Sequence, residues 1–190
     1  MKFSLLAVLS VFLLASCDTY TPYARPMGFP RIEVPGLAER SYLKFENQVC
    51  PFTFAFPEGG TITRDLSDSC WVDIRFPRYN LTWHITHRQT NETRTRASHY
   101  EDYRRLIYKH SKKATQITEE GIGFQNGYGV LFEIYGNVGT PAQLFYSDSS
   151  GSNIAMLSFY FQTAEKNDSL RPITDYMKEE VLNMARSIVW

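Results

Sequence analysis

Residues 70–87, with the sequence CWVDIRFPRYNLTWHITH, carry the clearest strand pattern in the chain and decide the expected fold. Apolar side chains alternate along two runs, at Val72, Ile74 and Phe76 and then at Leu81, Trp83 and Ile85. Successive side chains of a strand point to opposite faces, so each run places its apolar residues on one side. Residues 77–80 (PRYN) separate the runs and provide turn residues. The stretch therefore predicts an antiparallel hairpin with one buried face.

Four other segments have the composition of strands, and three of them follow one another closely. They are residues 52–56, 128–135, 142–146 and 154–161. The connecting segments 136–141 and 147–153 have the length and turn residues of hairpin loops. We therefore expect the last three strands to be antiparallel neighbours.

Two segments have helical spacing, with apolar residues three and four positions apart. The first begins with Ser98-His99-Tyr100-Glu101, which fits a capping box, and ends before Gly121. Its stripe contains Tyr100, Tyr103, Ile107, His110 and Ala114. The second begins near Ser169 or Pro172, and its stripe contains Ile173, Met177, Val181, Met184 and Ile188. The order of elements predicts an α+β fold, with an antiparallel β-sheet covered by helices.

The N-terminus has the pattern of an exported lipoprotein. Lys2 precedes an apolar run of about a dozen residues, which is a signal peptide and is shorter than the roughly 20 residues of a membrane span. The run ends in Leu14-Ala15-Ser16-Cys17, which resembles the bacterial lipobox. The alternative is an ordinary signal peptide followed by a chance cysteine. We expect Cys17 to carry acyl chains such as palmitate, which hold the protein at a membrane by about 0.8 kcal/mol per buried CH₂.

The expected organisation has three parts. Residues 1–16 form the lipoprotein signal peptide, residues 17–40 a lipidated Pro-rich tether, and residues 41–190 a single α+β globular domain. Four prolines favour extended chain in the tether. Its aromatic residues either dock along the domain or offer a binding strip to a partner.

Composition gives no support to some classes of partner. The 20 Lys and Arg residues balance the 20 Asp and Glu residues, so charge gives no reason to expect nucleic acid or an anionic membrane surface as a partner. The 43% hydrophobic content, with 15% aromatic residues, favours a compact domain over disorder.

Two cysteines remain once Cys17 is set aside. Cys50 and Cys70 lie in an oxidising exported compartment, where they are expected to form a disulfide. Closing this loop of about 20 residues stabilises the fold by about 3 kcal/mol. The alternative is a pair of free or metal-binding thiols.

The sequence contains no convergent set of catalytic residues, metal ligands or cofactor-binding residues. His84 and His87 point to opposite faces of their strand. His99 and His110 lie ~16 Å apart along a helix, too far to share a metal ion. Loop 147–153 contains Asp148-Ser149, the basis of an alternative hypothesis in which it serves a Ser/His/Asp site.

One modification site is also expected. Asp168-Ser169-Leu170 resembles a bacterial pattern for O-glycosylation, in which Asp precedes Ser or Thr and an aliphatic residue follows. Capping of the last helix by Ser169 is the competing use of this residue.

Ordered matches run over nearly the whole mature chain and together resemble one family. They include residues 20–32 of the tether, 50–54 (CPFTF), 70–77 (CWVDIRFP), 135–138 (YGNV), 145–149 (FYSDS) and 167–172 (NDSLRP). These segments are similar to those of the GldD family, the gliding motility-associated lipoproteins of Bacteroidota. The order of elements is also similar to the PsbP/Mog1-type α/β/α sandwich, an analogy that carries no function.

The resemblance implies a non-enzymatic lipoprotein of the cell envelope, facing the periplasm from the inner or the outer membrane. Its expected partners are other envelope proteins of the gliding and type IX secretion machinery, with no nucleic acid and no small-molecule substrate. The alternative is a periplasmic hydrolase, or a glycan-processing or glycan-binding lipoprotein, that uses loop 147–153.

Overall fold

The computed structural model describes residues 33–63, 70–162 and 167–190, which belong to one compact unit. The signal peptide, most of the tether and the lipid-attachment residue Cys17 lie outside the described residues. These parts, and the boundary at residue 41, stay predictions.

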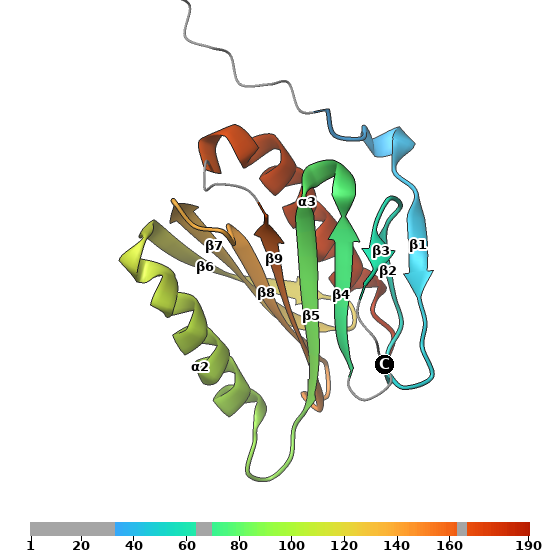
Figure 1. The fold of residues 1–190 in the computed structure, drawn as a ribbon. Coiled ribbons are helices and arrows are strands. Elements are labelled where there is room, and N and C mark those ends of the chain that lie inside the picture. The colour runs from blue at the N-terminus through green and yellow to red at the C-terminus, as the bar shows by residue number, and fades with distance from the viewer. Residues whose placement is uncertain (1–32, 64–69, 163–166) are drawn as a thin grey trace, which may run out of the picture. The chain divides into compact units, whose positions relative to one another are not determined.

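A seven-stranded antiparallel sheet forms the centre of the domain (Figure 1). Its strands lie in the order β3-β4-β5-β9-β8-β7-β6. Their bounds are β3 Thr61–Ile62, β4 Trp71–Phe76, β5 Leu81–Gln89, β6 Ala114–Phe124, β7 Gly127–Gly136, β8 Ala142–Asp148 and β9 Asn153–Phe161. The hairpin predicted within residues 70–87 is β4–β5, and the two later hairpins are β7–β8 and β8–β9, so these predictions are confirmed.

The long-range pairing of β5 with β9 joins the two halves of this sheet. The pairs run from Leu81 opposite Phe161 to Gln89 opposite Asn153. Trp83 and Phe159 face each other in this ladder, and both are fully buried. Since aromatic cross-strand pairs stabilise a sheet, this contact fixes the register at its centre.

One side of the sheet is covered by the last helix and by a small second sheet. Helix α3 (Asn167–Ser187) packs here together with β1 (Tyr42–Phe45) and β2 (Phe54–Pro57). The predicted stripe is buried in this core, with Ile173, Met177, Val181 and Met184 on α3 and Ile188 directly after its last residue. The opposite side of the sheet carries α2 (Arg96–Ile107), which continues into the 3-10 helix η3 (Tyr108–Lys112).

The prediction for residues 98–120 was wrong in two respects. The N-cap of α2 is Thr95, whose side chain accepts a hydrogen bond from the Ser98 amide at 3.2 Å, so Ser98 lies inside the helix. The helix ends at Ile107, and residues 114–124 form strand β6. β6 lies at the edge of the sheet, and none of its residues is fully buried. Its many polar residues therefore obscure the alternation of apolar and polar side chains that is typical of a strand.

The segment that leads into β1 is fixed to α3. Arg40 forms ion pairs with Glu179 at 2.9 Å and Glu180 at 3.0 Å, and Glu180 is only 1% exposed. Val34 packs against the core, and the 3-10 helix η1 (Leu37–Glu39) lies between them. Within the described residues, the end of the predicted tether therefore docks on the domain.

Cys50 and Cys70 form a disulfide, with their Cα atoms 5.1 Å apart. Cys50 lies between β1 and β2, and Cys70 directly precedes β4, so the bond links the small sheet to the large one. These cysteines are therefore not the free or metal-binding thiols of the alternative reading.

Replacing both cysteines with alanine is expected to lower the free energy of unfolding by about 3 kcal/mol, because the unfolded chain loses a cross-link. Urea unfolding with and without a thiol reductant checks this. Reductant should lower the midpoint of the wild-type protein and leave Cys50→Ala/Cys70→Ala unchanged. An equal midpoint for reduced and oxidised wild type would contradict a stabilising bridge.

Glu119 of β6 ties α2 to the edge of the sheet. Tyr100, Arg104 and Tyr108 each donate a hydrogen bond to its carboxylate, at 2.9, 2.8 and 2.6 Å. Burial tends to raise the pKa of Glu119, but the hydrogen bonds outweigh it and hold the pKa below its ordinary value. The folded state therefore gains stability from this carboxylate above about pH 4.5, which is lost as the pH falls through the lowered pKa.

Glu119→Gln is expected to cost about 1–2 kcal/mol at neutral pH and to reduce the acid-induced loss of stability. Thermal unfolding between neutral and acidic pH measures both effects. Glu120→Gln is the matched control, because Glu120 is exposed and forms no ion pair within the described residues. Equal stabilities of the two variants at every pH would contradict the role given to Glu119.

Candidate functional site

Helix α2 covers only part of its side of the sheet. Its buried residues Tyr103 and Ile107 contact β7, β8 and β9, through residues such as Phe132 and Phe145. Among the described residues, no helix lies over β4 and β5 on this side (Figure 1). The sheet therefore presents an open face beside α2, which we define by Trp71, Asp73, His84, Arg88 and Tyr160.

Polar and aromatic side chains contact one another on this open face. His84 and Asp73 lie opposite each other on β5 and β4, with their Nδ1 and Oδ1 atoms 2.8 Å apart. The ring of Tyr160 meets the His84 ring edge-on at 5.5 Å. The guanidinium of Arg88 lies over the Trp71 ring at 5.4 Å, a cation–π contact. Such a surface is suited to binding rather than to packing against a further layer.

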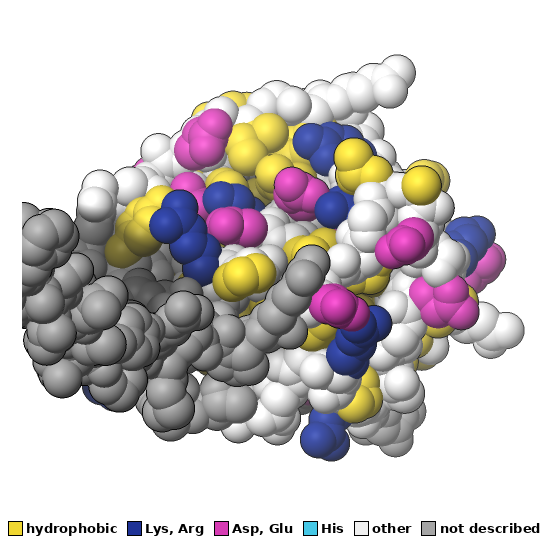
Figure 2. Space-filling model, turned by 90° about the horizontal axis from the view of Figure 1, so that it is seen from above, with side chains coloured by type: hydrophobic (Ala, Val, Ile, Leu, Met, Phe, Trp, Pro, Cys, Tyr) yellow, Lys and Arg dark blue, Asp and Glu magenta, His cyan; other side chains and the backbone are white. Residues whose placement is uncertain are grey.

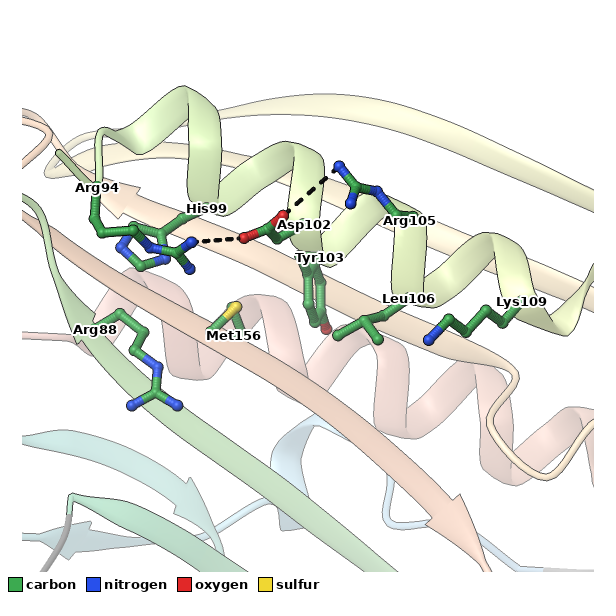
Figure 3. Close-up of a pocket in the computed structure, with 9 residues that line it drawn as sticks. All are labelled: Arg88, Arg94, His99, Asp102, Tyr103, Arg105, Leu106, Lys109 and Met156. Atoms are coloured by element: carbon green, nitrogen blue, oxygen red, sulfur yellow. Dashed lines mark ion pairs between the residues drawn. The ribbon is translucent and has the colours of Figure 1, made fainter.

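A basic groove of about 410 Å³ lies between α2 and the edge of the open face (Figure 3). Arg88 and Met156 come from β5 and β9, while the other residues come from α2 and its flanking segments. The lining comprises these two residues and Arg94, His99, Asp102, Tyr103, Arg105, Leu106 and Lys109.

The charged side chains of the groove are unevenly balanced. Four are basic, and Asp102 is the one acidic residue of the described lining. Asp102 pairs with Arg94 at 3.0 Å and with Arg105 at 3.8 Å. On the face of the molecule that Figure 2 shows from above, Lys and Arg side chains are interspersed with Asp and Glu side chains. The groove therefore concentrates positive charge on a chain whose net charge is zero.

Two buried side chains form the inner wall of the groove. The Tyr103 hydroxyl donates to the backbone carbonyl of Leu157 at 3.0 Å. His99 is 6% exposed, and its Nε2 atom has no hydrogen-bond partner among the described residues. Burial lowers the pKa of His99 and Arg94 lowers it further, whereas a hydrogen bond to the Gln89 backbone acts in the other direction. The net effect favours a neutral imidazole.

His84 and His87 lie on opposite faces of β5, as predicted, whereas His110 lies in η3 and not on the same α-helix as His99. His84 lies on the open face, while His87 packs between Phe52 and Trp190 on the opposite side. Among the residues described, no cluster of three His, Cys, Asp or Glu side chains could hold a metal ion.

Loop 147–153 is held together by its own hydrogen bonds. The Asp148 carboxylate accepts from the Ser150 hydroxyl at 2.9 Å and from the Asn153 side chain at 3.1 Å. The Ser149 hydroxyl forms no hydrogen bond with any described histidine or carboxylate, and Ser149 is exposed. A Ser/His/Asp arrangement at this loop is not assembled in the described chain.

Ser169 lies within the first turn of α3, because the helix already begins at Asn167. It is therefore not the residue that caps the helix. It is half-buried, and its O-glycosylation stays a prediction.

Sequence reasoning did not identify the groove. The sequence patterns single out none of the basic residues Arg88, Arg105 and Lys109. The available signal was the basic segment 88–96 (RQTNETRTR), which leads from β5 into α2. Whether this segment lies near Lys109 depends on how α2 packs on the sheet. A local sequence pattern does not contain that information.

The family model for the gliding motility lipoprotein GldD matches residues 18–190. The chain belongs to the GldD family of gliding motility lipoproteins. No curated protein matches it in sequence. In the described part of this lipoprotein, no helix has the length and apolar character that a membrane crossing requires.

Two solved structures are similar to this family member. The Ran-binding protein Mog1p of Saccharomyces cerevisiae matches with a TM-score of 0.52 at 9% identity, over 79% of this chain and 95% of its own. The cyanobacterial PsbP protein (CyanoP) of Synechocystis matches with a TM-score of 0.44 at 15% identity, over 84% of this chain and 98% of its own. The likeness to Mog1p agrees with the α+β sandwich described above, and the predicted fold class is confirmed.

Ser149→Ala is expected to leave both the thermal midpoint and gliding unchanged, because the exposed hydroxyl has no catalytic neighbour in the described chain. Complementation of a deletion strain with this variant measures gliding. Loss of gliding by a folded and correctly localised Ser149→Ala protein would contradict this expectation and support the alternative of a hydrolase that uses loop 147–153.

Proposed function

We propose that this lipoprotein is a non-enzymatic binding component of the gliding and type IX secretion machinery. It is anchored in the cell envelope through acylated Cys17, faces the periplasm, and acts by contacting other envelope proteins. The alternative of a hydrolase or glycan-processing enzyme at loop 147–153 has no specific observation in its favour.

The family match over residues 18–190 is the observation that carries this proposal. The open face and the basic groove support a binding role, because most of their aromatic and charged side chains stay at least partly exposed beside a rigid sheet. The ion pairs of Arg40 with α3 support a rigid connection between the domain and the chain that leads to the anchor.

Isolation of the protein from its own cells tests the proposal. The full-length chain, tagged at its C-terminus, is purified from gently solubilised membranes and its partners are identified by mass spectrometry. Components of the gliding and type IX secretion machinery should co-purify. A deletion strain should lose gliding and secretion, and the wild-type gene should restore both.

Cys17→Ser provides the control for the anchor. The mature wild-type protein should carry acyl chains on residue 17, and the variant should lack them and fail to restore gliding. Recovery of the wild-type protein alone, with gliding and secretion intact in the deletion strain, would contradict the proposal.

A further inference from the structure

Two basic side chains of the groove have no acidic partner among the described residues. Asp102 is already shared by Arg94 and Arg105. Lys109 forms no ion pair within the described residues, and the described contact of the Arg88 guanidinium is the face of Trp71. Positive charge that is unpaired inside a concave site attracts negatively charged groups and selects for them. The groove is therefore complementary to carboxylates.

His99 adds a second and independent observation. Its Nε2 atom is buried in the groove wall without a hydrogen-bond partner in the described chain. Because the ring also hydrogen-bonds to the Gln89 backbone, Nε2 is the free acceptor of a neutral imidazole. An unsatisfied buried acceptor is costly, so a donor brought by a ligand would be stabilised here.

The groove also has an apolar floor. Leu106 is 55% exposed, although it lies on the helix beside the buried Tyr103, and Met156 of β9 also lines the groove. His99 and Leu106 are separated by ~10 Å along the helix axis, so the site is elongated rather than a single point. Its length and chemistry suit an extended chain that alternates polar and apolar groups.

We infer that the basic groove binds an acidic peptide segment of a partner protein, in which carboxylate side chains alternate with aliphatic ones. The carboxylates pair with Arg88 and Lys109, and the aliphatic side chains cover Leu106 and Met156. A backbone N–H reaches His99 Nε2 as the groove wall adjusts to the peptide, because the protein encloses this atom in the structure described. This inference rests on the proposed function, since it names the chemistry of the protein partner.

Other anions fit these observations less well. A phosphate group favours cations that converge on one point, whereas Arg88 and Lys109 belong to different elements on either side of the groove. An anionic membrane surface is flat and would not reach into a recessed site. Among these ligands, a peptide combines carboxylates, aliphatic groups and N–H donors on one extended chain.

Fluorescence anisotropy with the full mature chain in detergent tests the inference. The probe is a short labelled peptide of alternating Asp and Leu residues, and its control replaces every Asp with Asn. The Asp peptide should bind, and its affinity should fall as salt is added. The Asn peptide should bind at least about fivefold more weakly.

Three variants locate the site. Arg88→Gln/Lys109→Gln should weaken binding of the Asp peptide by about fivefold or more. Lys44→Gln/Arg171→Gln removes the same charge from exposed positions on β1 and α3 and should leave binding unchanged. Leu106→Asp changes an exposed position, so it should fold normally and abolish binding.

Several results would overturn the inference. Equal affinity for the Asp and Asn peptides, or wild-type affinity in the Arg88/Lys109 variant, would show that the groove is not the peptide site. Groove-dependent binding of polygalacturonate, or of phosphatidylglycerol vesicles, without binding of the Asp peptide would assign the groove to an anionic glycan or lipid instead.

The co-purification experiment separates this inference from the proposed function. If the Arg88/Lys109 variant recovers the same partners as the wild-type protein, the groove assignment fails and the proposed function stands. If neither protein recovers partners, the proposed function fails. Loss of partners in this variant alone is the result we expect.

Discussion

The pairing of β5 with β9 is the contact on which the rest of the domain depends. It joins two hairpins from distant parts of the sequence, β4–β5 and β8–β9, into one sheet. The joined sheet then has two apolar sides, one for α3 with β1 and β2 and one for α2. Because a shift of one residue would exchange the two sides, the buried Trp83 and Phe159 also determine which surface each helix can cover.

The connection between β5 and β6 explains why a groove exists. The chain leaves β5 near the centre of the sheet and returns as the edge strand β6, so α2 crosses over β7, β8 and β9 on the way. Glu119 fixes α2 at the outer edge through hydrogen bonds from three side chains. Among the described residues, no helix covers β4 and β5 on this side (Figure 1), and the groove lies between these strands and α2.

The elements with strong apolar periods could be predicted from the sequence. The β4–β5 hairpin, the strands β7 to β9 and the stripe of α3 all bury one regular face. Strand β6 could not be predicted, because an edge strand pairs on one side only and keeps polar residues such as Glu119 and Glu120 along its length. The groove was missed for a different reason. Its charges come from separate elements, and only the tertiary packing of α2 brings Arg88 near the helix.

The central claim is that this lipoprotein works by contacting another envelope protein through the basic groove. Photo-cross-linking in intact cells measures this directly, with the photoreactive residue placed at Leu106 in the groove or at Leu43, an exposed position on β1. The account predicts adducts from position 106 that map to an acidic segment of an envelope protein. Adducts from position 43 with none from position 106 would contradict it.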